Sequence, residues 1–288
     1  MKPSTLYRLL FPFLAVATVG CASVDERPAA TVGTSAMARN VTLSTSTGQE
    51  FEVSVYAPQA APRAAILFSH GGGSWPEQYR AFVNSLTAEG FVVLAPTHAD
   101  SVKRTNPIAF NKPEAFQARI LELQAAGAYA KKSFNLPMGA VGHSYGSLFA
   151  AMAGGALQNV APARIPGLSA VLALSTPGII PGLVTPGAYR TLDVPYMLVT
   201  GGNDRIPGFL TNPADHLVAY NEGSGSNQFA VIVENGDHEL IASATPEASA
   251  ARQLAVAFLK AELLRHPASR SMLSQNPPAG VQLLRRRK

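Results

Sequence analysis

The 288-residue chain has little that could cross-link it, charge its surface or carry it through a bilayer. It contains a single cysteine, Cys21, which excludes an intramolecular disulfide. Only 14% of its residues are charged and 47% are hydrophobic, a composition that excludes disorder throughout the chain. No apolar run beyond the N-terminal region is long and uncharged enough to span a membrane, which excludes a protein with several membrane spans.

The formal net charge of +5 is concentrated at the two ends of the chain. Lys2 and Arg8 lie near the N-terminus, and Arg285, Arg286, Arg287 and Lys288 end the sequence. Residues 21–284 between them hold 17 basic and 18 acidic side chains. Nucleic-acid binding needs clustered basic residues on the folded part of a protein, so we expect no nucleic-acid partner.

Residues 1–20 have the organisation of an export signal peptide, with a basic start, an apolar stretch over 9–19 and small residues after it. Cys21 follows directly, and this stretch resembles a bacterial lipoprotein signal, in which such a cysteine becomes lipidated. Thr18 departs from the usual leucine of that signal. Cleavage after an ordinary site near 15–17 is the alternative. We expect export, with a lipid anchor on Cys21 in the cell envelope (outer membrane or periplasm), or otherwise secretion.

The remaining sequence divides into three segments. Residues 21–39 are small and polar, which predicts a flexible tether. Residues 40–265 contain the apolar runs of one folded catalytic domain, which we expect to be monomeric. Residues 266–288, with two adjacent prolines and the basic end, predict a solvated, disordered tail.

Short apolar runs alternate with helical stretches along the domain. The expected strands are Val41–Ser46, Phe51–Ala57, Ala64–Ser69, Phe91–Pro96, Met138–Gly142, Ala170–Ser175, Tyr196–Gly201 and Phe229–Glu234. The expected helices are Pro76–Glu89, Pro113–Lys132, Ser147–Leu157, Pro213–Glu222 and Pro246–Leu264. Uninterrupted apolar strands are typical of a parallel sheet buried on both faces. The pattern predicts an α/β fold with a doubly wound, mostly parallel, eight-stranded sheet.

One pentapeptide, Gly142-His143-Ser144-Tyr145-Gly146, lies between an expected strand and an expected helix. A serine on such a sharp turn is exposed at the strand end, and the glycines let neighbouring backbone approach it. We therefore predict Ser144 as a nucleophile and assign His143 a supporting role.

A nucleophilic serine needs a base and an acid that orients the base, and candidates for both follow later strands. Asp204 comes just after Tyr196–Gly201, and His238 just after Phe229–Glu234. The carboxyl ends of parallel strands meet at one edge of a sheet, so we predict a catalytic group of Ser144, Asp204 and His238. The competing histidines are His216, expected on a helix surface, and His98, expected to pack against a loop.

A loop of three glycines follows the expected strand Ala64–Ser69. His70-Gly71-Gly72-Gly73 matches the loops that donate a main-chain N–H to an oxyanion. We predict an oxyanion hole formed by the N–H groups of Gly72 and Tyr145, with Gly73 as the alternative to Gly72.

Two aromatic residues after this loop, Trp75 and Tyr79, are candidates for substrate binding, and core packing is the alternative for both. A metal site built from His98, Asp100, Asp237 and His238 lacks a tight ligand spacing and would occupy the predicted base. We therefore expect no metal and no cofactor.

These motifs, in this order, make residues 40–265 resemble the α/β-hydrolase superfamily. The stretches Phe68–Gly73 and Ala95–Asp100 are similar to the dienelactone-hydrolase-like group, which includes platelet-activating-factor acetylhydrolase-type lipases and secreted polyester hydrolases. True dienelactone hydrolases have a cysteine nucleophile where this chain has Ser144. The resemblance implies hydrolysis of a small-molecule or lipid carboxylic ester. The alternative is a non-catalytic surface lipoprotein that uses the fold for binding.

Overall fold

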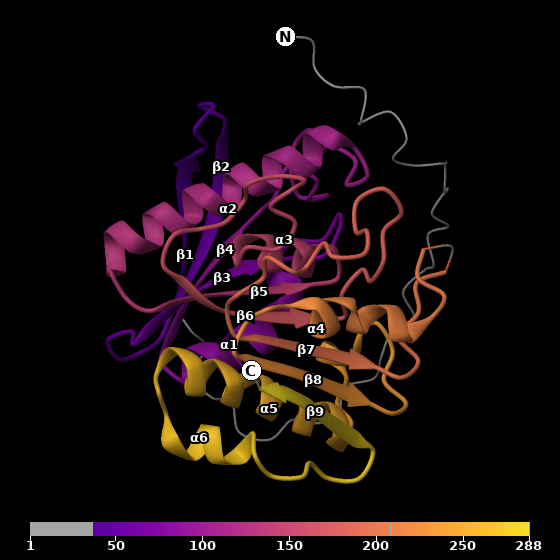
Figure 1. Cartoon of the computed structure of the whole chain (residues 1–288). Coiled ribbons are helices and arrows are strands. Elements are labelled where there is room, and N and C mark those ends of the chain that lie inside the picture. Colours follow the sequence, from indigo (N-terminus) through magenta and orange to yellow (C-terminus); the bar gives the residue numbers. More distant parts are fainter. Residues whose placement is uncertain (1–36, 208, 288) are drawn as a thin grey trace, which may run out of the picture.

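The apolar runs of the sequence lie side by side as the strands of one sheet (Figure 1). The computed structural model describes residues 37–207 and 209–287. Within these residues nine strands follow the order β1-β2-β4-β3-β5-β6-β7-β8-β9. The strands are β1 (Met37–Ser44), β2 (Glu50–Ala57), β3 (Ala64–Ser69), β4 (Phe91–Pro96), β5 (Met138–His143), β6 (Leu168–Leu174), β7 (Tyr196–Gly201), β8 (Asn227–Val233) and β9 (Val281–Arg287).

The middle of the sheet is parallel and its two edges are antiparallel. Strands β3 to β8 pair in parallel, while β1, β2 and β9 join by antiparallel pairing. Every residue of β3, β4, β5 and β7 is buried, which explains why their sequences are uninterrupted apolar runs. The predicted doubly wound, mostly parallel α/β fold is confirmed.

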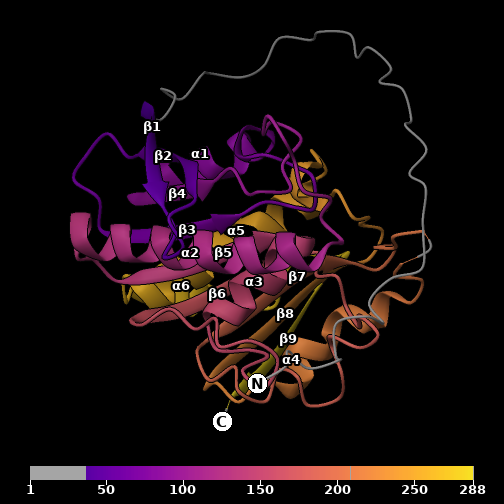
Figure 2. The ribbon, with the colours of Figure 1, turned by 90° about the horizontal axis from the view of Figure 1, so that it is seen from above.

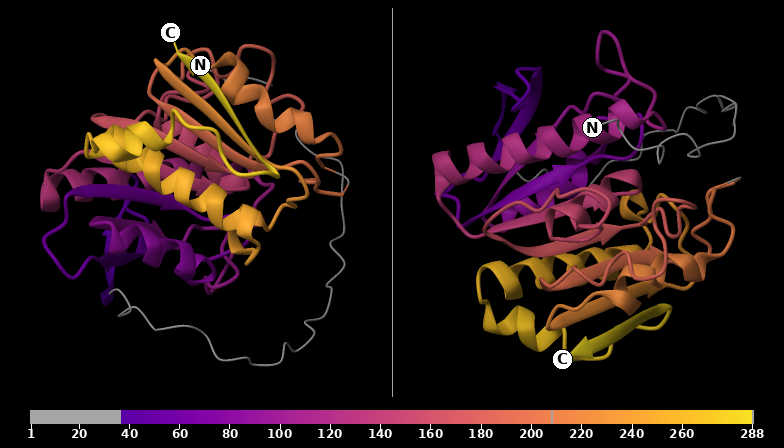
Figure 3. Two further views of the ribbon diagram at one scale, coloured as in Figure 1. Left: turned by 90° about the horizontal axis from the view of Figure 1, so that it is seen from below. Right: turned by 45° about the horizontal axis from the view of Figure 1, so that its top comes forward.

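Helices cover both faces of the sheet (Figure 2, Figure 3). The α-helices are α1 (Arg80–Ala88), α2 (Pro113–Phe134), α3 (Tyr145–Ala153), α4 (Val218–Glu222), α5 (Pro246–Leu263) and α6 (Pro267–Met272), and short 3₁₀ turns are η2 (Pro76–Tyr79), η3 (Pro213–Leu217) and η4 (Leu240–Ala242). Apolar side chains of α2, α3 and α4 belong to one core cluster, and those of α1 and α5 belong to a second cluster across the sheet. None of the helices described is long and apolar enough to cross a membrane.

The prediction of a disordered tail over 266–288 is wrong for the described residues, because this segment forms α6 and the ninth strand, β9. Strand β9 pairs antiparallel with β8 and buries Val281 and Leu283, while Gln282 between them is exposed. The Arg285 guanidinium donates a 2.7 Å hydrogen bond to the Leu273 carbonyl oxygen. The strand was not predicted because its short apolar alternation is followed directly by basic residues. Main-chain oxygens at helix ends accept hydrogen bonds from those arginines.

The folded domain therefore starts before residue 40 and extends beyond residue 265. The predicted signal peptide (1–20), Cys21 and most of the predicted tether (21–39) lie outside the described residues.

We expect Leu283→Ala to destabilise the protein by about 2–4 kcal/mol, because it removes a buried side chain from the β9 face that packs on the core. The exposed neighbour Gln282→Ala is the matched control, with an expected change below about 0.5 kcal/mol. Urea unfolding monitored by circular dichroism measures both changes. Equal stability of the two variants would contradict a structural role for the C-terminal strand.

Candidate active site

Three predicted site residues meet at the carboxyl edge of the sheet. Ser144 follows β5, Asp204 follows β7 and His238 follows β8. Ser144 Oγ lies 2.9 Å from His238 Nε2, and His238 Nδ1 lies 2.8 Å from Asp204 Oδ1. Such a chain can take the proton of a serine hydroxyl as that hydroxyl attacks a carbonyl carbon.

Ser144 occupies a strained turn between β5 and α3. Its φ and ψ angles are 52° and −127°, and its N–H donates to the Leu174 carbonyl oxygen at 2.9 Å. A Cβ atom on Gly146 would lie 2.1 Å from the Ser69 carbonyl oxygen, and one on Gly142 would lie 2.2 Å from the Gly146 carbonyl oxygen. Only glycine fits at these two positions, so the pentapeptide pattern follows from crowding around the turn.

Asp204 is fully buried, and its carboxylate accepts hydrogen bonds from several neighbours. The Thr200 hydroxyl donates to Oδ2 at 2.9 Å, and His216 Nε2 lies 3.2 Å from Oδ1, which also faces His238. Burial alone would raise the pKa of Asp204, but the hydrogen bonds from His216 and His238 hold it well below its usual range. Asp204 is therefore ionised at neutral pH.

The expectation that His216 lies on a helix surface is wrong. Its side chain is fully buried, and it belongs to the 3₁₀ turn η3 rather than to a regular α-helix over 213–222. Both ring nitrogens have polar neighbours, which makes the burial of an imidazole possible.

The glycine loop after β3 uses two of its three N–H groups internally. The Gly71 N–H donates to the Tyr79 hydroxyl at 3.0 Å, and the Gly73 N–H donates to Asp100 Oδ2 at 2.9 Å. The Gly72 N–H has no hydrogen-bond acceptor among the described residues. This distribution favours Gly72 over Gly73 as the donor that remains available to a ligand.

Tyr145, which carries the second predicted donor, is the first residue of α3, where a main-chain N–H has no acceptor one turn earlier. The Phe110 ring lies next to Gly72 and next to the Tyr145 ring. Its centroid is 5.7 Å from that of Tyr145, and a Cβ atom on Gly72 would lie 3.1 Å from Phe110 Cγ. Phe110 is 41% exposed, and its place beside these residues was not predicted from the sequence.

Arg119 of α2 holds the glycine loop from behind and is fully buried. Its guanidinium donates to Asp100 at 2.7 and 2.8 Å, to the His70 carbonyl oxygen at 2.7 Å and to the Gly71 carbonyl oxygen at 2.9 Å. Because the peptide unit is planar and trans, drawing the Gly71 oxygen toward Arg119 turns the Gly72 N–H to the opposite side. Arg119 thus sets the direction of that N–H.

Two buried carboxyl groups near Arg119 differ in their protonation behaviour. Burial alone would raise the pKa of Asp100, but the paired Arg119 charge lowers it below its usual range. Burial raises the pKa of Glu122 to about 8, although Arg119 opposes that shift. Glu122 Oε2 lies 2.7 Å from Nδ1 of His98, which packs against the loop as predicted. Among the residues described, no three His, Cys, Asp or Glu side chains are grouped to hold a metal ion.

A second network joins the glycine loop to the segment that carries His238. The Tyr79 hydroxyl accepts from the Gly71 N–H and lies 3.0 Å from His143 Nδ1, while His143 Nε2 lies 3.0 Å from the His238 carbonyl oxygen. Burial, followed by the nearby His238, lowers the pKa of His143 to about 4, so this ring is neutral at pH 7.

The two aromatic residues predicted to bind substrate differ in their surroundings. The hydroxyl of Tyr79 is engaged in the hydrogen bonds of the glycine loop. Trp75 precedes η2, and the Lys103 ammonium group lies 4.7 Å from its ring centroid. A substrate contact by either ring stays a prediction.

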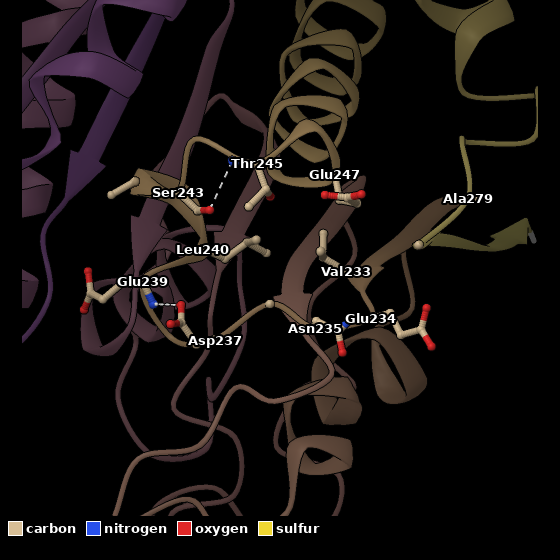
Figure 4. A pocket seen from close by; sticks show the side chains of 13 residues that line it. Val233, Glu234, Asn235, Asp237, Glu239, Leu240, Ser243, Thr245, Glu247 and Ala279 are labelled. Carbon is tan, nitrogen blue, oxygen red and sulfur yellow. Dashed lines mark hydrogen bonds between the residues drawn. The ribbon is translucent and has the colours of Figure 1, made fainter. Parts of the chain in front are cut away.

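A cavity of about 720 Å³ is lined by residues on both sides of His238 in the sequence (Figure 4). Its walls include Asp237, Glu239 and Leu240, but Ser144 and His238 do not line it. The cavity is therefore separate from the Ser144 hydroxyl.

Arg119, Glu122 and Phe110 were not predicted from the sequence. One signal was available for the first two, because Ala115, Arg119, Glu122 and Ala126 recur at helical spacing on the buried face of α2. Opposite charges on an apolar stripe indicate a buried polar network. No comparable pattern marks Phe110, which lies in an irregular loop.

We expect Arg119→Met to cost about 3–5 kcal/mol of folding free energy, because it leaves Asp100 buried without its partner. The double variant with Asp100→Asn should recover part of that loss. Arg164→Ala is the matched control, since the Arg164–Asp193 pair is exposed and is expected to contribute about 1 kcal/mol or less. Chemical unfolding measures the stability of all three variants. An equal loss of stability in Arg119→Met and Arg164→Ala would contradict the role of Arg119 in holding the glycine loop.

Comparison with protein-family models and with curated proteins by sequence gives no match. Three solved structures are similar in fold. A cold-adapted esterase from an Arctic intertidal metagenomic library has a TM-score of 0.61 at 17% identity, covering 81% of this chain and 97% of its own. The esterase domain of a Rhodothermus marinus protein has a TM-score of 0.55 at 17% identity, covering 79% of this chain and 99% of its own.

An acylaminoacyl peptidase from Pyrococcus horikoshii has a TM-score of 0.61 at 11% identity, covering 80% of this chain. The match spans only 42% of the peptidase. Identities this low bear on the fold and not on the substrate. The strand order, the turn at Ser144 and these structural likenesses agree that the chain has the α/β-hydrolase fold.

Proposed function

We propose that this protein is a serine hydrolase that cleaves carboxylic esters through an acyl-enzyme intermediate. The observation that carries the proposal is the hydrogen-bonded chain from Ser144 Oγ through His238 to a buried, ionised Asp204. The esterases among the structural neighbours support the same class of reaction. A scaffold that served only for binding would not need these three groups within hydrogen-bond distance of one another.

In the proposed reaction, Ser144 Oγ attacks the ester carbonyl carbon while His238 Nε2 takes the hydroxyl proton. His238 then gives that proton to the leaving alcohol as the bond to the alcohol oxygen breaks. A water molecule attacks the acyl-enzyme with His238 again as the base, and the acid product leaves with Ser144 restored. Asp204 stabilises the imidazolium ion and keeps the ring oriented.

The negative charge that develops on the carbonyl oxygen is stabilised by the N–H groups of Gly72 and Tyr145. Gly72 is favoured because the N–H groups of Gly71 and Gly73 already donate to acceptors within the protein. The hydrogen bond from Arg119 to the Gly71 oxygen also turns the Gly72 N–H away from Arg119. These donors are fixed before the substrate binds, so little reorganisation accompanies the reaction.

The half-exposed ring of Phe110, next to Gly72 and the Tyr145 ring, favours esters with an apolar group near the carbonyl. Small-molecule and lipid esters both meet this requirement. We further propose membership of the dienelactone-hydrolase-like group, on the sequence motifs, with Ser144 in place of cysteine.

Export is a separate proposal, supported by the sequence of residues 1–20. The position of Cys21 directly after that segment supports a lipid anchor in the cell envelope.

We expect Ser144→Ala to lower kcat/KM for 4-nitrophenyl esters by at least about a thousandfold, because no other group can form the acyl-enzyme. The assay compares acetate, butyrate and decanoate esters. A fluorophosphonate probe should label the wild type at Ser144, located by mass spectrometry. Ser249→Ala on α5 is the control and should keep both turnover and labelling. Absence of turnover and labelling in the wild type would refute the proposal and favour a binding protein.

We expect kcat/KM to fall by about tenfold per pH unit on the acid side of its profile, because His238 must be neutral to accept the Ser144 proton. The lowered pKa of Asp204 keeps that carboxylate ionised across this range, so it adds no second inflection. The stability that Asp204 contributes is present above its unfolded pKa of about 4 and is lost only as the pH falls below it. Enzyme held at pH 5 should therefore recover fully at pH 7. A flat profile down to pH 4 would exclude His238 as the base.

A further inference from the structure

Two imidazole rings share one oxygen of the buried carboxylate. Asp204 Oδ1 lies 2.8 Å from His238 Nδ1 and 3.2 Å from His216 Nε2. The mechanism proposed above requires the first contact, and it assigns no part to the second. His216 is fully buried, so it reaches neither solvent nor a substrate directly.

The surroundings of His216 define which ring nitrogen carries the proton. Nε2 faces two acceptors, Asp204 Oδ1 and the Asp204 main-chain oxygen at 3.1 Å, so it must donate. Nδ1 lies 3.3 Å from the Thr176 hydroxyl, which also donates to the His216 main-chain oxygen at 3.4 Å. His216 thus gives its Nε2 proton to the Asp204 residue from η3, while Thr176 approaches from the loop after β6.

His216 cannot replace His238 as a base. Its Nε2 is turned to Asp204 and its Nδ1 to Thr176, whereas Ser144 Oγ is hydrogen-bonded to His238. Any influence of His216 on the reaction must therefore pass through Asp204.

We propose that His216 is a positioning residue that shares Asp204 Oδ1 with His238 and thereby weakens the hold of the carboxylate on the protonated base. This inference rests on the proposed function for its effect on turnover. A second donor on a carboxylate oxygen withdraws charge from the other hydrogen bonds of that oxygen. His238 then releases its proton to the leaving alcohol more readily than it would beside an unshared carboxylate.

Other charged and titratable groups face His238, and they stay constant when His216 is changed. His143 from β5 packs against the His238 ring with centroids 5.1 Å apart, and Ser144 lies at Nε2. The neighbouring carboxylates of the same segment, Asp237 and Glu239, are exposed to solvent. A substitution at His216 therefore affects His238 through Asp204.

The test compares His216→Leu, which removes the donor, with His216→Gln, whose amide nitrogen can occupy the place of Nε2. Removing the donor strengthens the pairing of Asp204 with the charged form of His238. We expect the acid limb of the kcat/KM profile of His216→Leu to move to higher pH by about half a unit to one unit. His216→Gln should return the limb to its wild-type position. His266→Leu, at the start of α6, controls for loss of a histidine elsewhere.

A second readout does not require turnover. The pH midpoint of the His238 ring signals in ¹H–¹⁵N spectra, assigned with a His238→Gln variant, should shift upward in His216→Leu and not in His216→Gln. This measurement tests the coupling between the His216 and His238 rings separately from the proposed function. A shifted midpoint in a protein that cleaves no ester would refute the proposed function and keep the coupling between the two rings.

Two results would overturn the inference. One is an unchanged midpoint and an unchanged acid limb in a folded His216→Leu variant. The other is an equal change in the leucine and glutamine variants, which would mean that His216 only fills space. If His216→Leu does not fold, His216→Met provides the second test, because its flexible side chain fills similar space without a donor and should move the limb in the same direction.

Discussion

The close approach of β3, β5 and α3 at Ser144 is the constraint on which the rest of the site depends. The turn places the first residues of α3 against the Ser69 carbonyl oxygen, and there is no room for a Cβ atom at Gly142 or Gly146. This crowding fixes Ser144 in a strained conformation with its hydroxyl at the end of the sheet. The neighbouring strands then determine what that hydroxyl meets, because β7 and β8 deliver Asp204 and His238 to the same edge.

Burial alone does not decide the charge of the acidic groups around this edge. Asp100 and Asp204 are both buried and both stay ionised, because each receives several well-placed hydrogen bonds. Glu122 has one unpartnered oxygen, Oε1, and burial dominates its pKa. The negative charge therefore collects on the two carboxylates that have donors facing them, one behind the glycine loop and one behind His238.

The buried strands and the helices between them could be predicted from hydrophobic patterning, because each strand of the parallel sheet is long enough to give a continuous apolar run. The positions of Ser144, Asp204 and His238 after β5, β7 and β8 followed from the same pattern. The strand β9 could not be recognised, since only Val281 and Leu283 mark its buried face among basic residues. The contact of His216 with Asp204 depends on a 3₁₀ turn, and no periodicity in the sequence distinguishes that turn from the start of a helix.

The hydrogen bonds that link the glycine loop to His238 through Tyr79 and His143 have a defined order of donors and acceptors. Tyr79 accepts from the Gly71 N–H and therefore donates to His143 Nδ1, which leaves the His143 proton on Nε2, facing the His238 carbonyl oxygen. A main-chain carbonyl cannot pass a proton onward, so this chain ends there. The two loops are held at a fixed spacing by a connection that conducts no proton, so no proton passes along it between the glycine loop and the His238 segment.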